Sequence, residues 1–426
     1  MVDPALSCVA WGPPWPKHGA GLAGSWLLGV WWGDDRSRDT SACIRAGGLP
    51  GERSSATLNI QTVVVGTMEQ KNLSALQGRG AVANPTGRFE SASLEAFDDG
   101  WGSLGLSSEA PTTRVLAENT RRILSQNDSP DLPFRQTINP YKGCEHGCIY
   151  CYARPTHAYL GLSPGLDFET RLYSKPAAAK LLRRELSRRA YRPSLIVLGA
   201  NTDPYQPIER RLGITRELLE VLQEFRHPVA ITTKSAGVLR DLDLLAPMAS
   251  EGLAQVFVSV TTLDPKLSRR MEPRAAAPAR RIHAMSALAE AGVPVGVLAS
   301  PMIPGLNDME LEGILAASRE AGAVAAGYIL LRLPGEVQSL FQDWLETHYP
   351  LKAAAVLERV RQTRSGALNE SAFGTRMRGT GTDAELLASR YRLALRRLRY
   401  RDRMPSPDFS RFRVPGRAGP QLALAF

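Results

Sequence analysis

The sequence predicts an α/β fold, and two observations support this prediction. Six short apolar or β-branched runs follow one another between residues 137 and 331, and helical stretches alternate with them. Runs of this kind are typical of strands buried on both faces of a parallel sheet. Because a repeated strand–helix–strand order requires right-handed crossovers, we expect a parallel sheet that forms a partial (β/α)6 barrel.

Each expected element has a local signal. Strands are expected where β-branched or apolar residues cluster, at Thr137–Ile138, Leu195–Leu198, Val229–Thr233, Val256–Val260, Val295–Leu298 and Tyr328–Leu331. Helices are expected in the stretches between these strands, at Lys175–Ala190, Ile214–Phe225, Val238–Met248, Ala277–Ala291 and Glu310–Ala321.

The chain divides into five expected parts. The partial barrel is one large domain, and extensions precede and follow it. The parts are a segment over 1–67, a polar segment over 68–130 that wraps the barrel, the barrel over 131–335, a helical segment over 336–403 and a basic flexible tail over 404–426.

Residues 1–67 differ from the rest in composition. Five of the seven tryptophans occur there among Gly, Pro and Arg, without helical or strand periodicity. We expect this segment to be disordered, or to precede a true start at Met68. An apolar stretch from Gly19 to Gly33 follows Lys17, so a signal peptide is the alternative.

The composition indicates in which cellular compartment the protein is expected. The chain has 426 residues, of which 43% are hydrophobic, and it contains no run of eighteen apolar residues, so we expect no membrane span. Five cysteines do not make a disulfide framework and indicate a reducing compartment, so we expect a cytoplasmic protein.

The net charge of +10 is concentrated near the C-terminus, where ten arginines and two aspartates lie between Arg390 and Phe426. Such a run is commonly a solvated helix face. It is also a footprint for nucleic acid, with rings that can stack on bases at Tyr391, Tyr400, Phe409 and Phe412.

Three cysteines lie within eight residues, in the order C-x-x-x-C-x-x-C. Cys144, Cys148 and Cys151 suit a loop that wraps an iron–sulfur cluster and leaves one iron open to an outside ligand. A structural zinc site is the alternative, with His146 or His157 as the fourth ligand, but such sites usually use two separated ligand pairs and this chain offers one group.

With Tyr150 before the third cysteine, the motif resembles the radical S-adenosylmethionine (SAM) superfamily, whose signature is C-x-x-x-C-x-aromatic-C. The runs Asn139–Cys144 and Cys151–Pro155 are similar to bacterial relatives of spore photoproduct lyase, often labelled DNA repair photolyases. The segments Gln77–Ala81, Glu145–Leu160 and Ala367–Gly374 resemble an uncharacterised branch of that group.

The resemblance implies two cofactors, a [4Fe-4S] cluster held by the three cysteines and SAM bound at the open iron. Polar residues follow the expected strands, where ligands of such barrels bind. The SAM contacts that the resemblance implies are Tyr150, Asn201, Asp203, Lys234, Ser259, Thr261 and Asn307. As an alternative, Ser, Thr and Asn after strands are also ordinary turn and N-cap residues, and Asp203–Pro204 and Asn307–Asp308 fit turns.

The implied activity is reductive cleavage of SAM to a 5′-deoxyadenosyl radical that acts on an unidentified substrate, with nucleic acid repair or modification as one class. A reductant such as flavodoxin or ferredoxin is the implied electron source. Spore photoproduct lyase requires a further cysteine as hydrogen-atom donor, whereas no cysteine follows Cys151 here, so Tyr152 and Tyr205 are candidate catalytic residues. The alternative function is a non-catalytic iron–sulfur or redox-sensing protein.

The last six residues form a Q-x-x-L-x-F pattern after an arginine- and glycine-containing linker. This pattern resembles the peptide by which bacterial repair proteins bind the sliding clamp, with Gln421, Leu424 and Phe426 as its contacts. A short apolar tail that folds back on the domain is the alternative.

Overall fold

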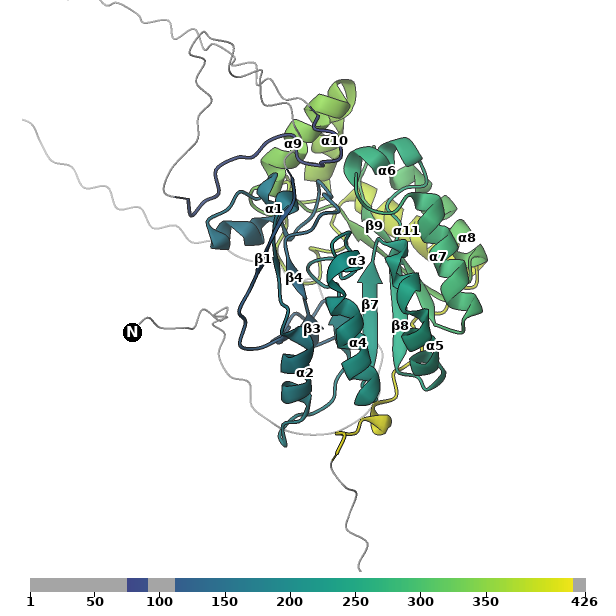
Figure 1. The fold of residues 1–426 in the computed structure, drawn as a ribbon. Helices are drawn as coiled ribbons and strands as arrows, with labels where there is room; N and C mark the ends of the chain where they lie inside the picture. Colours follow the sequence, from purple (N-terminus) through teal and green to yellow (C-terminus); the bar gives the residue numbers. More distant parts are fainter. Residues whose placement is uncertain (1–74, 91–111, 417–426) are drawn as a thin grey trace, which may run out of the picture. The chain divides into compact units, whose positions relative to one another are not determined.

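The computed structural model describes residues 75–90 and 112–416 (Figure 1). Its centre is a seven-stranded sheet with the strand order β10-β9-β8-β7-β6-β3-β2. Six strands are parallel to their neighbours, which confirms the predicted α/β fold with a parallel sheet. These six are β3 Gln136–Ile138, β6 Ile196–Leu198, β7 Val229–Thr233, β8 Ala254–Ser259, β9 Val295–Met302 and β10 Ala325–Leu330.

Four further strands were not expected from the sequence. Strand β2 Leu124–Gln126 pairs antiparallel with β3 and forms one edge of the main sheet. A separate three-stranded sheet combines β1 Arg114–Ala117, β4 Tyr141–Lys142 and β5 Arg171–Ser174. These strands are two to four residues long, and β1 exposes three of its four residues. Their sequences therefore lack the run or alternation of apolar residues by which a strand is predicted.

The helices between the strands pack on the sheet through apolar stripes. In α4 Ile214–Glu224, the buried residues Ile214, Leu218 and Leu222 recur every four positions, as a core-facing helix requires. The expected helix over Val238–Met248 is divided into a 3-10 turn, η3 Ala236–Asp241, and helix α5 Leu242–Ser250. The other helices of this region are α1 Asp167–Thr170, α2 Ala178–Leu186, α3 Glu209–Leu212, α6 Pro265–Met271, α7 Pro278–Glu290 and α8 Leu311–Glu320, and the short 3-10 helices are η2 Arg154–Leu160 and η4 Asp308–Glu310.

Three helices follow the sheet: α9 Val337–His348, α10 Pro350–Gln362 and α11 Thr382–Arg397. Helices α9 and α10 lie at the top of the view in Figure 1, above the ends of the strand arrows. Their apolar residues form a second core with Ile149 and Tyr150 of the cysteine segment. The fully buried Trp344 of α9 anchors this core, because its indole N–H donates to the carbonyl of Arg270 at 3.0 Å.

The last described residues are packed against the sheet, which differs from the flexible tail expected from residue 404 onward. The Asp408 and Arg413 N–H groups donate to the carbonyls of Gly252 and Phe225. The ring of Phe412 lies between Tyr191 and His227, with centroid distances of 5.6 and 5.5 Å. Phe412 is therefore half-buried against the core, and its ring is engaged with these aromatic side chains and is not free to stack on bases.

Several expectations concern residues outside the described ranges. They are the segment over 1–67, part of the wrapping segment over 68–130, and the C-terminal pattern at Gln421, Leu424 and Phe426. Among the helices within 75–90 and 112–416, none is both long and apolar enough for a membrane crossing.

His227, just before β7, is fully buried, and both of its ring nitrogens have a hydrogen-bond partner. Its Nδ1 lies 2.9 Å from the Pro228 carbonyl and its Nε2 lies 2.7 Å from the Tyr191 hydroxyl. Burial lowers the pKa of His227 to about 4, whereas an exposed histidine titrates near 6.5.

This pKa difference predicts a loss of stability in acid. As pH falls from 7 to 5, the unfolded chain binds a proton at His227 that the folded chain does not, which lowers the free energy of unfolding by about 2 kcal/mol. In urea titrations at both pH values, the His227→Gln variant should lack this part of the loss. The same substitution at the exposed His283 is the control, and equal behaviour of the two variants would contradict the prediction.

Candidate functional site

The three cysteines of the motif lie in one loop between β4 and η2, which we call the cysteine loop (residues 143–152). Cys144 and Cys148 are buried and Cys151 is half-buried, and all three thiols are free. The loop follows β3 and β4, on the side of the sheet where the parallel strands end. The structure therefore brings the predicted cluster ligands to the edge at which barrels of this type bind ligands.

Electrostatics couples the three thiols. Burial raises the pKa of Cys144, and the nearby Asp203, Cys148 and Cys151 raise it further. Backbone N–H groups oppose this effect: that of Asp203 donates to Cys144, and those of Ala153 and Arg154 donate to Cys151. Such N–H donors are typical of the surroundings of cluster thiolates.

The donor set suits an iron–sulfur cluster because it consists of thiols alone, from one short loop. Within the described ranges, no group of three or more His, Cys, Asp or Glu side chains is arranged for direct coordination of a single metal ion. His146, the fourth ligand of the zinc alternative, is engaged elsewhere: its Nδ1 lies 3.4 Å from the carboxylate of Asp203. The other candidate, His157, places its Nε2 2.9 Å from the Arg171 carbonyl.

A buried ion pair supports the cysteine loop from below. Arg154 and Glu169 are both fully buried, and an Arg154 Nη2 lies 2.5 Å from Glu169 Oε1. The same guanidinium donates to the carbonyls of Gly147 and Cys148, at 3.2 and 2.9 Å, and to two more at Pro164 and Gly165. Every N–H of Arg154 thus has an acceptor, and the ion pair fixes the backbone that carries Cys148.

The glycine-rich segment Gln77–Ala81 packs against the same loop. The N–H groups of Gly80 and Ala81 donate to the Glu169 carboxylate at 3.0 and 2.9 Å. A Cβ on Gly80 would stand 1.7 Å from the Gly147 carbonyl oxygen, and Gly147 itself has a φ of 67°. Both positions therefore require glycine, one for close approach of two backbones and one for a left-handed conformation.

Asp203, a predicted SAM contact, holds neighbouring loops together. Its carboxylate accepts hydrogen bonds from the Thr233 hydroxyl and from the N–H groups of Lys234 and Tyr205, at 2.7 to 2.9 Å. Although burial raises its pKa, His146 and these donors lower it more, so the pKa of Asp203 lies below its ordinary value. The side chain links the end of β7 to the cysteine loop.

Tyr150 is joined to a buried network that the sequence did not suggest. Its hydroxyl donates to Glu272, which also accepts from Thr261 at 2.6 Å and pairs with Arg281. All four side chains are at most 7% exposed. Arg281 continues the network to the Ser259 carbonyl at 3.0 Å, so the end of β8 and the cysteine loop are held in one arrangement.

Lys234 lies beside this network with its ammonium 5.8 Å from the centre of the Tyr150 ring. Burial lowers its pKa, while Cys148 raises it and Arg281 lowers it. Within the described part of the chain, its Nζ makes no ion pair, which distinguishes it from the neighbouring Arg281. Lys234 is therefore an available cation close to the thiols.

The remaining predicted SAM contacts are placed differently. The side-chain amide of Asn307 is used internally, donating to the Thr261 and Pro301 carbonyls and accepting from the Ile303 N–H. Thr261 is fully buried and bonded to Glu272. Asn201 is half-buried, and its N–H donates to the Asn139 side chain. Ser259 is buried at the end of β8.

The two candidate catalytic tyrosines, Tyr152 and Tyr205, have different surroundings. Tyr152 is 45% exposed, directly follows Cys151, and has the Arg332 guanidinium 5.1 Å from its ring centre. Burial of its hydroxyl, which donates to the Ala200 carbonyl, raises its pKa to about 12, with a contribution from Cys151. Tyr205 is buried, and its hydroxyl donates to Asp241 at 2.9 Å. Both phenols therefore have an acceptor, and the two tyrosines differ in that only Tyr152 has an exposed ring beside a cysteine of the motif.

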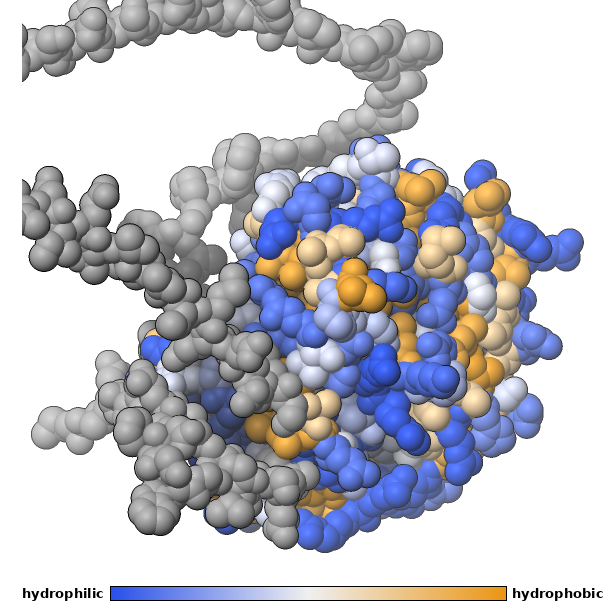
Figure 2. Space-filling view, turned by 90° about the horizontal axis from the view of Figure 1, so that it is seen from above, coloured by the Kyte–Doolittle hydropathy of each residue, from blue (hydrophilic) through white to orange (hydrophobic). Residues whose placement is uncertain are grey.

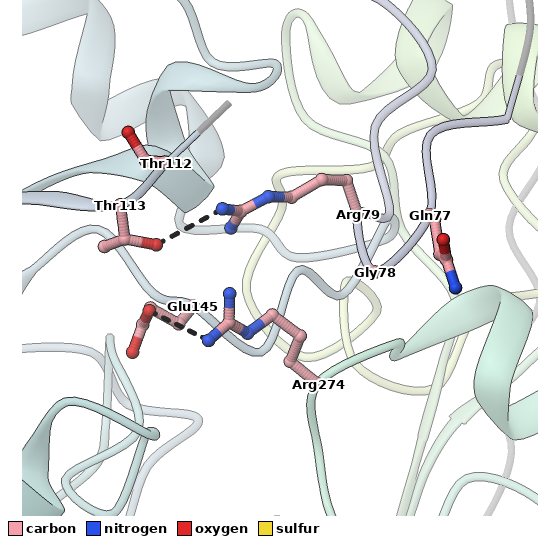
Figure 3. Close-up of a pocket in the computed structure, with 7 residues that line it drawn as sticks. All are labelled: Gln77, Gly78, Arg79, Thr112, Thr113, Glu145 and Arg274. Carbon is pink, nitrogen blue, oxygen red and sulfur yellow. Dashed lines mark hydrogen bonds and ion pairs between the residues drawn. The ribbon is translucent and has the colours of Figure 1, made fainter. Parts of the chain in front are cut away.

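A cavity of about 480 Å³ lies beside the cysteine loop (Figure 3). Arg79 and Arg274 reach into it, and they contact Thr113 and Glu145 at 3.2 Å each. The charged side chains Arg274 and Glu145 of its lining form an ion pair with each other. From above, the surface is mostly hydrophilic with scattered apolar residues (Figure 2).

The sequence did not predict the buried charged residues that hold the cysteine loop and Tyr150 in place. Glu169, Glu272 and Arg281 carry no motif and lie 9 to 122 residues from the side chains that they contact. Only Arg154 was within a segment that resembled a family, and its role as a loop support had no signal in the sequence.

The Arg154–Glu169 pair predicts a large stability difference between two glutamate variants. Glu169→Ala leaves a buried guanidinium without its carboxylate, so it should lower the free energy of unfolding by about 3 to 5 kcal/mol. Glu224→Ala breaks the exposed pair with Arg183 and should cost less than about 1 kcal/mol. Denaturant unfolding measures both, and similar small losses would contradict the role given to Glu169.

Comparison with known proteins identifies relatives for about half of the chain. The uncharacterized proteins Rv2578c of Mycobacterium tuberculosis and Mb2609c of Mycobacterium bovis are each 38% identical over 221 residues, which covers 51% of this chain and 65% of each relative. The match thus spans less than two thirds of their length. The uncharacterized protein MJ0683 of Methanocaldococcus jannaschii is 29% identical over 219 residues, 51% of this chain and 77% of that protein.

Among solved structures, spore photoproduct lyase complexed with a dinucleoside spore photoproduct aligns with a TM-score of 0.47 and 16% identity, over 67% of this chain and 78% of that chain. SuiB of Streptococcus suis bound to S-adenosylmethionine aligns with a TM-score of 0.36 and 14% identity, over 61% and 47%. Residues 138–317 match the family model of the radical SAM superfamily. This match, over residues 138–317, confirms the resemblance seen in the cysteine motif.

Proposed function

We propose that this protein is a radical SAM enzyme in which Cys144, Cys148 and Cys151 hold a [4Fe-4S] cluster. The observation that carries the proposal is the cysteine loop, with three free thiols at the end of a parallel sheet. When bound, the cluster and SAM supply a 5′-deoxyadenosyl radical for hydrogen-atom abstraction from a substrate. A flavodoxin or ferredoxin is the class of protein that would deliver the electron.

In this proposal, side chains of the protein bind SAM and orient the residues around it. Lys234 offers its ammonium to the SAM carboxylate, because it lies near Cys148 and makes no ion pair in the described residues. The Glu272–Arg281 pair holds Tyr150 and the end of β8 in place around Lys234.

The exposed surface beside Cys151 supports a nucleic acid as the substrate. Tyr152 lies under Arg332, which makes no ion pair with a described residue. Phe373 is 59% exposed and lies 4.7 Å from the guanidinium of Arg376, which is itself paired with Asp131 at 2.6 Å. Arg376 is close enough to Arg332 to lower its pKa, although burial lowers it more. Rings combined with guanidinium groups suit bases and phosphates.

Replacement of each cysteine by alanine should abolish production of 5′-deoxyadenosine, because three thiolates are needed to hold the cluster. The measurement is iron and sulfide content after anaerobic reconstitution, followed by chromatography of the products formed with SAM and dithionite. An intact cluster that never cleaves SAM would instead favour the alternative of a non-catalytic iron–sulfur or redox-sensing protein.

Lys234→Met should weaken SAM binding roughly ten- to hundredfold, because a charge-assisted hydrogen bond is lost. Equilibrium dialysis of labelled SAM against the reconstituted protein measures the change. Lys180→Met, on the exposed face of α2, is the matched control. Unchanged affinity in the Lys234 variant at normal iron content would remove Lys234 from the SAM site.

A further inference from the structure

The chain from Arg401 to Arg413 crosses the sheet at the end opposite the cysteine loop. The Arg401 N–H donates to Val324, just before β10, at 2.8 Å. Farther along, Asp408 is bonded to Gly252, just before β8, and Arg413 to Phe225, just before β7. Because these strands are parallel, every contact lies where strands begin. We call this end, made of residues 188–192 and 396–413, the base; its C-terminal part is the yellow segment at the bottom of Figure 1.

The base is a packed support. The Tyr400 hydroxyl donates to the Leu315 carbonyl at 2.7 Å, and Arg319 Nε donates to the Leu398 carbonyl at 3.1 Å. At the other side, Phe412 joins this segment to Tyr191 at a ring distance of 5.6 Å. The side chains that point outward are therefore presented from fixed backbone.

Those outward side chains are predominantly arginines. The base contains ten arginines and two aspartates, and all ten arginines are exposed. Only Arg411 forms an ion pair with a described residue, through Asp408 and Glu251. The ten are Arg188, Arg189, Arg192, Arg396, Arg397, Arg399, Arg401, Arg403, Arg411 and Arg413.

We propose that the base is a docking surface for double-helical nucleic acid, which it binds through the phosphates. Many like charges without intramolecular partners repel one another, and a polyanion removes that repulsion. Guanidinium groups bind phosphate oxygens bidentately, and each contact releases counterions from the duplex. The charge of the base thus specifies an anionic partner, and its rigid presentation suits phosphates at fixed spacing.

The aromatic residues decide between duplex and single strand. Single-strand binding uses exposed rings on which bases stack. Here the hydroxyls of Tyr391 and Tyr400 are bonded to main-chain carbonyls, and Phe412 is inside the aromatic cluster. Phe409 is the exposed ring of the base, at 38%. A surface of arginines with little stacking area fits a duplex of any sequence.

The position of the base gives this docking a separate role from catalysis. The cysteine loop and the base lie at opposite ends of the parallel sheet, so a duplex held at the base does not itself reach the thiols. Docking would keep the protein on nucleic acid and raise the local concentration of a substrate there. This inference does not rest on the proposed function, since it needs no cluster and no SAM.

The test compares two arginine pairs that each occupy the last turn of a helix. Arg396 and Arg397 end α11 on the base, and the exposed Arg210 and Arg211 end α3. Binding of the full chain to a fluorescent duplex of about 20 base pairs is followed by anisotropy at several salt concentrations. The Arg396→Ala/Arg397→Ala variant should bind severalfold more weakly, with a log–log salt slope smaller by about 2.

The Arg210→Ala/Arg211→Ala variant should bind like the unmodified chain, and equal unfolding midpoints of both variants exclude misfolding. Equal losses in the two variants would overturn the proposal, as would failure of the unmodified chain to bind at about 50 mM salt. Binding to phosphatidylserine vesicles without binding to the duplex would assign the base to membranes and would also overturn it.

Discussion

The buried Arg154–Glu169 ion pair is the interaction on which the site depends. Its guanidinium donates to carbonyls of the cysteine loop and of the turn before α1, and to Glu169 itself. Its carboxylate receives two backbone N–H groups from the segment at Gly80. A charge pair of this kind is costly to bury and requires complete hydrogen bonding. It therefore admits one arrangement of three segments that are distant in the sequence, and the cysteine loop lies among them.

A second buried pair acts in the same way on the other side of the loop. Glu272 binds the Tyr150 hydroxyl and Arg281 binds the end of β8, while the ammonium of Lys234 nearby has no carboxylate partner among the residues that the structure describes. The polar residues at the strand ends thus fall into two groups. Asp203, Thr261 and Asn307 spend their hydrogen bonds on the fold, whereas Lys234 remains available to a ligand.

The two ends of the parallel sheet differ in chemistry for a topological reason. Loops after the strands carry the thiols and polar side chains, while the sheet and its helices supply the main core. At the opposite end, the C-terminal segment covers the strand beginnings and bonds to Val324, Gly252 and Phe225. Covering that end leaves its arginines outside, so the chain presents a cationic surface away from the thiols.

Local pattern was enough to predict the six parallel strands, the alternation with helices and the cysteine loop. Buried β-branched runs such as Val229–Thr233 and close cysteine spacing are properties of neighbouring residues, so the sequence by itself determined them. Strands β1, β4 and β5 pair across long separations, and Glu169 and Glu272 find their arginines only in the folded chain. The commitment of Tyr205 to Asp241 and of Phe412 to the core also arises from contacts between distant segments. Tertiary structure alone decided these points, because which polar group is buried beside which is set by packing and not by spacing along the chain.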